Sequence, residues 1–291
     1  MHTSIRESDT SSAAAPAPRR RRRLTPSATI GGAVLAVILV AAVAPVVFTR
    51  VSPDEIDIVA RLAPPSAAHP LGTDNIGRDL LARLVYGARI SLLVAVISIG
   101  GAAGIGVTVG LLAGYYGGWT ESGLMRVVDI FLAFPAILLA LALVAVLGAG
   151  ITSVIIALTL VFWTQYARVV RAATLSEREK AYVEAARAIG AGNTRILLRH
   201  VLPNVISPVI ILATLGMGTA VVAESTLSFL GMGVQPPAPS WGWTLAFGTR
   251  YLRDAPHIAT FSGLAIMLTV LGFNLLGDGV RDMLDPKFRP Q

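Results

Sequence analysis

The chain has 291 residues, of which 54% are hydrophobic and only 14% are charged, and its formal net charge is +7. Soluble domains have roughly 45–50% apolar and about 25% charged residues, so this composition excludes a cytosolic globule and indicates an all-α integral membrane protein. The arginines cluster at the ends of apolar runs, where positive charge sets membrane orientation, so we expect membrane lipid and not nucleic acid around the chain. The absence of cysteine excludes disulfides and thiol catalysis.

Residues 1–28 are rich in Ser, Ala, Pro and Arg and end near the basic cluster Arg19 to Arg23, which predicts a disordered tail. The segment that follows changes character. Ile30 to Phe48 is an uncharged apolar run of 19 residues. As a helix it would be about 28 Å long, so we predict a first transmembrane helix over residues 29–49.

A signal peptide is the alternative for this start, because a basic region precedes an apolar run and Ala42-Val43-Ala44 resembles a cleavage site. The run exceeds the roughly 7 to 15 residues of a signal core, and Pro45 would stand directly after the cut. These two features favour a retained helix.

After an external loop over residues 50–87, residues 88–281 are predicted to form a transmembrane domain, and residues 282–291 a cytoplasmic C-terminus. Apolar runs in this domain predict five more helices, which makes a bundle of six. Their approximate ranges are 90–115, 127–147, 151–170, 205–230 and 258–280.

Charge asymmetry predicts the orientation of this bundle. With six helices both termini lie on one side of the membrane, and that side carries 17 Lys and Arg against seven on the other. Because cytoplasmic loops carry the excess of Lys and Arg, we expect both termini in the cytoplasm.

Small residues recur every four positions in the second predicted helix, at Gly106, Gly110 and Gly114. Such a ridge lets a neighbouring helix approach closely. We interpret these glycines as helix-packing residues.

The sequence lacks the motifs of membrane energetics and of enzymes. It has no phosphate-binding G-x-x-x-x-G-K-[ST] loop, and its four histidines form no metal-binding pattern. We therefore expect no catalytic residue, no metal and no cofactor held by this chain. Acids inside the predicted helices are few, Glu224 being the clearest, which disfavours but leaves open the alternative of a proton-coupled secondary transporter.

The segment 174–203 between the fourth and fifth predicted helices is the most polar part of the bundle. Ser176 and Glu179 have the spacing of a capping box, and Gly190 suits the end of the helix that would follow. We expect Asn193 or Thr194 to cap a second short helix, which Pro203 would close. The first helix would present a narrow apolar face to a partner's groove, formed by Tyr182, Ala185, Ala186 and Ile189.

This segment resembles a known family. Glu184-Ala185-Ala186, then Gly190 and Leu202-Pro203, match the EAA motif of the permeases of binding-protein-dependent ABC importers. His200 stands where the family usually has an aliphatic residue. The resemblance implies a type I importer permease in which this segment is a coupling helix, with ATPase-coupling residues Glu184, Ala185, Ala186, Ile189, Gly190, Leu202 and Pro203.

Three further stretches resemble the C-type permease of oligopeptide and dipeptide importers. They are Leu71 to Asp74 with Gly77 to Asp79, Tyr86 to Ser91, and Ala223 to Gly231. The branch includes nickel importers, so a nickel cargo stays open.

The resemblance implies three kinds of protein partner: a homologous second permease, cytoplasmic ATPase subunits or a fused ATPase that bind ATP and Mg²⁺, and an extracytoplasmic peptide-binding protein. The complex would lie in the cytoplasmic membrane, in contact with its lipid. On this basis the chain is a pore-forming subunit for peptides and not itself an enzyme.

Glu224 lies inside the fifth predicted helix, with Ser228 one turn further on the same face. A charged acid is costly in lipid, so we expect it to face protein or water. Two roles are open: a hydrogen bond to the partner permease, or a place in the outer vestibule of the translocation path.

Overall fold

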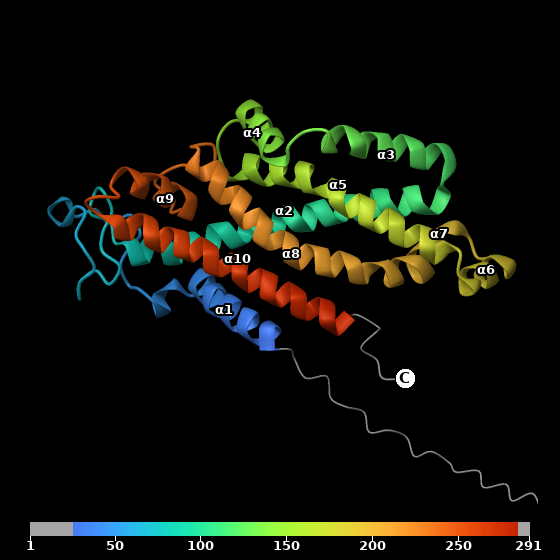
Figure 1. The fold of residues 1–291 in the computed structure, drawn as a ribbon, viewed down its shortest axis with the longest axis horizontal. Helices are drawn as coiled ribbons and strands as arrows, with labels where there is room; N and C mark the ends of the chain where they lie inside the picture. Colours follow the sequence, from blue (N-terminus) through green and yellow to red (C-terminus); the bar gives the residue numbers. More distant parts are fainter. Residues whose placement is uncertain (1–25, 285–291) are drawn as a thin grey trace, which may run out of the picture.

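The computed structural model describes residues 26–284, and the predictions made for residues 1–25 and 285–291 lie outside this range. Within it all regular structure is helical, and the helices run alongside one another in an elongated bundle (Figure 1). α6 and α7 lie at one end of the bundle, and α9 lies at the other; we call these the α6 end and the α9 end. The helices are α1 (Pro26–Val43), α2 (Leu80–Tyr116), α3 (Gly118–Leu132), α4 (Ala136–Leu147), α5 (Ile151–Arg178), α6 (Ala181–Ala188), α7 (Asn193–Ile196), α8 (Leu202–Phe229), α9 (Trp241–Arg250) and α10 (Pro256–Leu284).

Five helical segments of the described chain are long and apolar enough to cross a membrane. They are α1, α2, α5, the continuous stretch Asn193–Phe229 that contains α8, and α10. The pair α3 and α4 makes a sixth if it is counted as one broken span. The all-α membrane fold is therefore confirmed, with five or six spans by length and composition.

The prediction of one continuous helix over residues 127–147 is wrong. α3 ends at Leu132, α4 begins at Ala136, and the two are bent by 88°. Pro135 stands at the break. Proline lacks an N–H for the helical ladder and disfavours helical angles in the residue before it, so the apolar run cannot continue as one rod.

The boundaries around the first loop also differ from the prediction. α1 ends at Val43 and not near residue 49, because Ala44 precedes Pro45 and takes the non-helical angles φ −126° and ψ 65°. The predicted loop over 50–87 ends early, because Asp79 caps α2 by accepting a hydrogen bond from the Ala82 amide at 2.8 Å.

The loop before α2 is held by buried charge. Arg83 is only 1% exposed, and its Nη1 donates to the Pro53 carbonyl at 3.1 Å. Asp74 accepts from the Arg78 Nε at 2.7 Å. The first of the peptide-importer-like stretches therefore fastens the loop to the start of α2.

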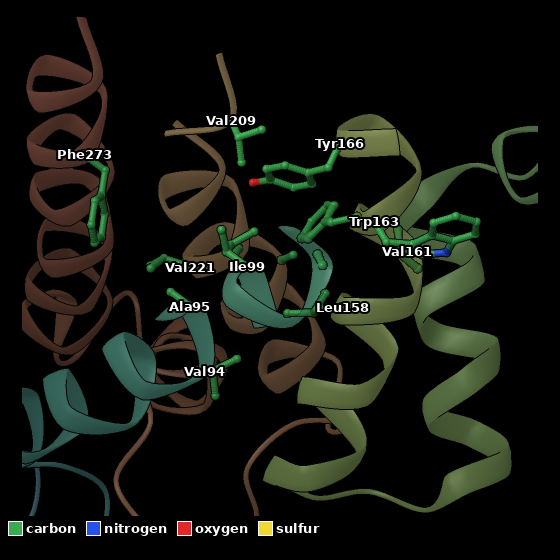
Figure 2. Packing of buried hydrophobic residues seen from close by; sticks show 14 of the residues in the cluster. Val94, Ala95, Ile99, Leu158, Val161, Trp163, Tyr166, Val209, Val221 and Phe273 are labelled. Carbon is green, nitrogen blue, oxygen red and sulfur yellow. The ribbon is translucent and has the colours of Figure 1, made fainter. Parts of the chain in front are cut away.

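The core is built on α2, which packs against both α5 and α8. Figure 2 shows Ile99 of α2 between Leu158 of α5 and Val221 of α8, with Val94 of α2 lying below them. All four side chains are buried. α2 is thus the central helix, and what it contacts at each end positions the candidate site.

The predicted glycine ridge of α2 lies against α5. A Cβ added to Gly110 would come 2.6 Å from the Ala167 carbonyl, and one added to Gly114 would come 2.7 Å from the Cβ of Thr174. Gly106 meets Trp163 and Tyr166 in the same way. Only glycine allows these backbones to approach so closely, so α2 and α5 form one tight pair.

Candidate functional site

The segment at the α6 end begins later than the capping box predicted. α5 continues through Arg178, so Ser176 and Glu179 do not start a helix, and α6 begins at Ala181 after Lys180. Glu177, in the last turn of α5, accepts from the Lys180 ammonium at 2.7 Å. α5 extends beyond the end of its apolar run because its last turns still pack against α2.

The two faces of α6 differ in exposure. Val183 and Ala186 are buried and belong to the hydrophobic core, which anchors the helix. Glu184 and Ala185 are exposed, and Ile189 is 86% exposed. Of the predicted apolar face, Ala186 is buried and Tyr182 is held by contacts with α5 and α8, which leaves Ala185 and Ile189 exposed in the described chain.

The turn after α6 requires glycine for its backbone angle. Gly190 has φ +81°, in the left-handed region, and its amide donates to the Arg187 carbonyl at 2.9 Å. A Cβ at this position would meet nothing within 4 Å. The constraint is therefore conformational and not one of space.

The second helix starts differently from the prediction. Gly192 occupies the cap position of α7, and neither Asn193 nor Thr194 caps it. The Asn193 Oδ1 instead accepts a hydrogen bond from the Tyr115 hydroxyl at 3.0 Å. The amide side chain is used for a contact with α2.

Leu202 and Pro203 do not close that helix. A π-helical turn over Leu197–Val201 leads directly into α8, and Pro203 lies exposed in the first turn of α8, where a proline needs no amide partner. Leu202 is half-buried and packs against the core. The segment is thus continuous with a spanning helix.

Tyr182 connects α5, α6 and α8. Its hydroxyl donates to Glu177, lies 3.2 Å from the His200 carbonyl, and accepts from the Asn204 amide at 3.1 Å. Burial, together with the hydrogen bond and charge of Glu177, raises the pKa of Tyr182 to about 12. The hydroxyl therefore remains protonated at neutral pH.

Sequence reasoning missed Tyr115 and Arg178, which join the end of α2 to this segment. Arg178 Nη1 donates to the Gly114 carbonyl at 2.8 Å, and Arg187 lies over the Tyr115 ring at 5.4 Å. Tyr115 and Asn193 are 78 residues apart in sequence. No local periodicity could have paired them.

Glu224 is enclosed by its own chain, and its two predicted roles, a bond to the partner permease or a place in the outer vestibule, stay predictions. It is 0% exposed, and its carboxylate accepts from Ser228 at 2.7 Å, Ser91 at 3.3 Å, and Ser225 and Ser240 at 3.4 Å each. A buried carboxylate requires donors, and here hydroxyls of the same chain supply them. Ser228 is on the expected face, whereas Ser91 and Ser240 were missed.

The peptide-importer-like stretches gather at the α9 end. The bond between Ser91 and Glu224 joins two of them directly. Trp241 of α9 donates its indole N–H to the Leu84 carbonyl of α2 at 2.8 Å. The EAA-like segment lies at the opposite end, so the chain holds two separate candidate regions (Figure 1).

Between residues 26 and 284, no group of three or more His, Cys, Asp or Glu side chains is placed to hold a metal ion.

Comparison with known proteins gives a consistent assignment. The family model described as "Binding-protein-dependent transport system inner membrane component" matches residues 106–290. The dipeptide transport system permease protein DppC of Alkalihalophilus pseudofirmus is 47% identical over 252 residues, which cover 87% of this chain and 83% of that protein. The glutathione transport system permease protein GsiD of Pectobacterium atrosepticum is 46% identical over 225 residues, covering 77% of this chain and 75% of that protein.

A solved structure supports the fold. A chain of the MetNI methionine ABC transporter, in an inward-facing conformation, superposes with a TM-score of 0.56 and 23% sequence identity. The match covers 69% of this chain and 96% of that chain.

Proposed function

Because this chain belongs to the family of binding-protein-dependent transport system inner membrane components, and is therefore a non-catalytic, multi-pass permease subunit of an ABC importer, we propose that it translocates peptides and is driven through its α6 segment. The names of its relatives, which are dipeptide and glutathione permeases, support a small peptide as the cargo, and the oligopeptide cargo rests on the resemblance of the sequence motifs.

The observation that carries the proposed coupling is the divided surface of α6. Val183 and Ala186 hold the helix on the bundle, while Glu184, Ala185 and Ile189 are left exposed at its end. A short helix with small and apolar side chains on its free side suits a groove in a partner. The partner in this proposal is an ATPase subunit that binds ATP and Mg²⁺.

The proposed assembly contains a homologous second permease, ATPase subunits at the α6 end and a peptide-binding protein at the α9 end. It lies in the cytoplasmic membrane, with the α6 end and both termini in the cytoplasm. The excess of Lys and Arg on that side supports this orientation. A reporter fused at residue 190 that is active outside the cell would contradict it.

The mechanism follows from two ligands that favour different states of one bundle. ATP would close the ATPase pair and displace α6, and the bundle would switch from inward-open to outward-open. The docked binding protein would then release its peptide into the path. Hydrolysis would restore the first state.

The test is transport by the purified complex in proteoliposomes, with a labelled dipeptide, a labelled oligopeptide, glutathione and nickel as cargo. We expect uptake of at least one peptide that requires ATP and the binding protein. Nickel uptake without peptide uptake would assign the cargo to nickel. Uptake driven by a proton gradient without ATP would contradict the proposed function.

A further inference from the structure

The last turn of α2 is fixed to the coupling segment by a buried tyrosine. Tyr115 is 7% exposed, although it stands one residue from the end of its helix. Its hydroxyl is paired with Asn193 at 3.0 Å, as a buried hydroxyl requires. Its neighbour Tyr116 is 50% exposed and provides a natural comparison.

Two arginines from the other side complete this contact. Arg178, the last residue of α5, donates from Nη1 to the carbonyls of Gly114 at 2.8 Å and Tyr115 at 3.3 Å. The last carbonyls of a helix lack partners within it and attract cations, so this placement is favourable. Arg187 of α6 adds a cation–π contact with the Tyr115 ring.

Besides the contacts of Tyr182, Val183 and Ala186, α6 is connected to its neighbours in the chain by short non-helical links. Glu179 and Lys180 separate it from α5, and residues 189–192, including Gly190 and Gly192, separate it from α7. A displacement of α6 could therefore be absorbed in these links. Contacts that bypass the links are needed if the displacement is to reach the spanning helices.

We propose that Tyr115, Arg178, Arg187 and Asn193 form a clamp that makes the segment of α6 and α7 and the α2–α5 pair move as one body. Arg187 is the contact from α6, and Asn193 is the contact from α7. The clamp reaches α2 at the end of the glycine ridge, where Gly110 and Gly114 hold α2 tightly against α5. These are positioning residues, which act through α6. The inference rests on the proposed function and names the part of the bundle that α6 drives first.

The first experiment compares Tyr115→Phe with the control Tyr116→Phe in the full transporter. Tyr115→Phe keeps the ring under Arg187 and removes only the bond to Asn193. We expect uptake per ATP hydrolysed to fall about fivefold, the factor that the loss of one ordinary hydrogen bond corresponds to. ATP hydrolysis and the KM for peptide should stay unchanged, and Tyr116→Phe should match the wild type.

Substitutions at the acceptor separate the clamp from a general structural role. Asn193→Ala removes the acceptor, and Asn193→Asp keeps an oxygen in its place. The clamp predicts that Asn193→Ala lowers uptake per ATP and that Asn193→Asp restores it. It also predicts that the double variant with Tyr115→Phe and Asn193→Ala has the same uptake per ATP as Asn193→Ala alone, because both substitutions remove the same bond.

A distance measurement tests the movement directly. The chain contains no cysteine, so spin labels at Leu112→Cys in α2 and Thr194→Cys in α7 are specific in a complex whose other cysteines have been removed. We expect the same label distance without nucleotide and with trapped ATP. In Tyr115→Phe the distance should change between the two states.

The outcomes separate the two proposals. A wild-type complex without ATP-driven uptake would refute the proposed function. Two outcomes would refute the clamp alone. The first is normal uptake by the wild type together with an unchanged uptake per ATP in Tyr115→Phe. The second is a label distance that changes between the two states in the wild type. If Tyr115→Phe does not assemble, the wild-type label distance decides.

Discussion

Two ionisable side chains of the α9 end, Glu224 and Arg83, are buried within the chain, whereas at the α6 end Ile189 is exposed beside a glycine turn. At the α9 end Glu224 accepts hydrogen bonds from four serines, and Arg83 lies among the loop carbonyls and acids that hold it. At the α6 end Ile189 stands at the end of a short helix, and residues 26–284 leave its side chain 86% exposed.

The difference concerns these two groups of residues and not the whole of either end, since Ile58 and Val59 in the loop before α2 are also 72% and 98% exposed. The Glu224 carboxylate accepts from hydroxyls of its own chain, which fixes its surroundings, whereas Nε and Nη2 of Arg83 are buried without a hydrogen-bond partner. A single exposed apolar residue is common on a protein surface, so the role of Ile189 as a contact rests on the proposed coupling. Substitutions at the α9 end should therefore lower stability, and those at the α6 end should lower transport.

The largest loss of stability is expected from Gly242→Val at the α9 end. A Cβ there would overlap the backbone of Ser225, 2.8 Å from its Cα, and a backbone cannot move aside as a side chain can. We expect the free energy of unfolding to fall by about 3 kcal/mol, measured as the melting temperature in detergent. Gly263→Val is the control, because a Cβ there meets nothing within 4 Å. Equal melting of the two variants would contradict this packing.

A smaller loss is expected from Glu224→Leu, which leaves buried serine hydroxyls without their acceptor. The free energy of unfolding should fall by about 2 kcal/mol. Glu224→Gln keeps a carbonyl acceptor of the same shape and should lose less than half of that. If both variants melt like the wild type, Glu224 does not hold α8 to Ser91 and Ser240.

At the α6 end, Gly190→Val should cost about 1 to 2 kcal/mol, because a side chain strains a backbone with φ +81°. Its main effect should be on uptake per ATP, since the strain reorients α6 against its partner. Gly192→Val is the matched control, with open space around it and φ −67°. Similar uptake by both variants would show that the turn angle at Gly190 does not matter.

The smallest effect on stability is expected from Ile189→Ser. The side chain is 86% exposed, so the melting temperature should match that of the wild type. Uptake should nevertheless fall, because the proposed partner loses an apolar contact. The control is Val146→Ser at the end of α4, where the side chain is 87% exposed. Normal uptake with Ile189→Ser would mean that this face is not the docking surface.

Much of the fold could be predicted because apolar runs of sufficient length have few alternatives to a spanning helix. The α3–α4 break could have been found as well, since Pro135 was visible inside the predicted run. The loop geometry around Arg83 could not, because it depends on carbonyls from residues far apart in sequence.

The candidate site also contains some features that the sequence could predict and others that it could not. Gly190 could be predicted because a left-handed turn strongly favours glycine, whatever surrounds it. The capping residues could not, because Ser176 and Asn193 have other uses in the folded chain: one lies within α5, and the other accepts from Tyr115. Local patterns fail where a distant residue competes for the same side chain.

The length of α2 has a consequence for the surrounding bilayer. Its 37 residues make a rod of about 55 Å, while a hydrocarbon core is only about 30 Å thick. The helix must tilt or project from the lipid, which places Arg89 near one surface and Tyr115 near the other. A thicker bilayer would draw one of these polar ends toward the acyl chains, at a cost that tilting relieves. Lipid chain length would then change how far α2 leans, with the sequence and the partners unaltered.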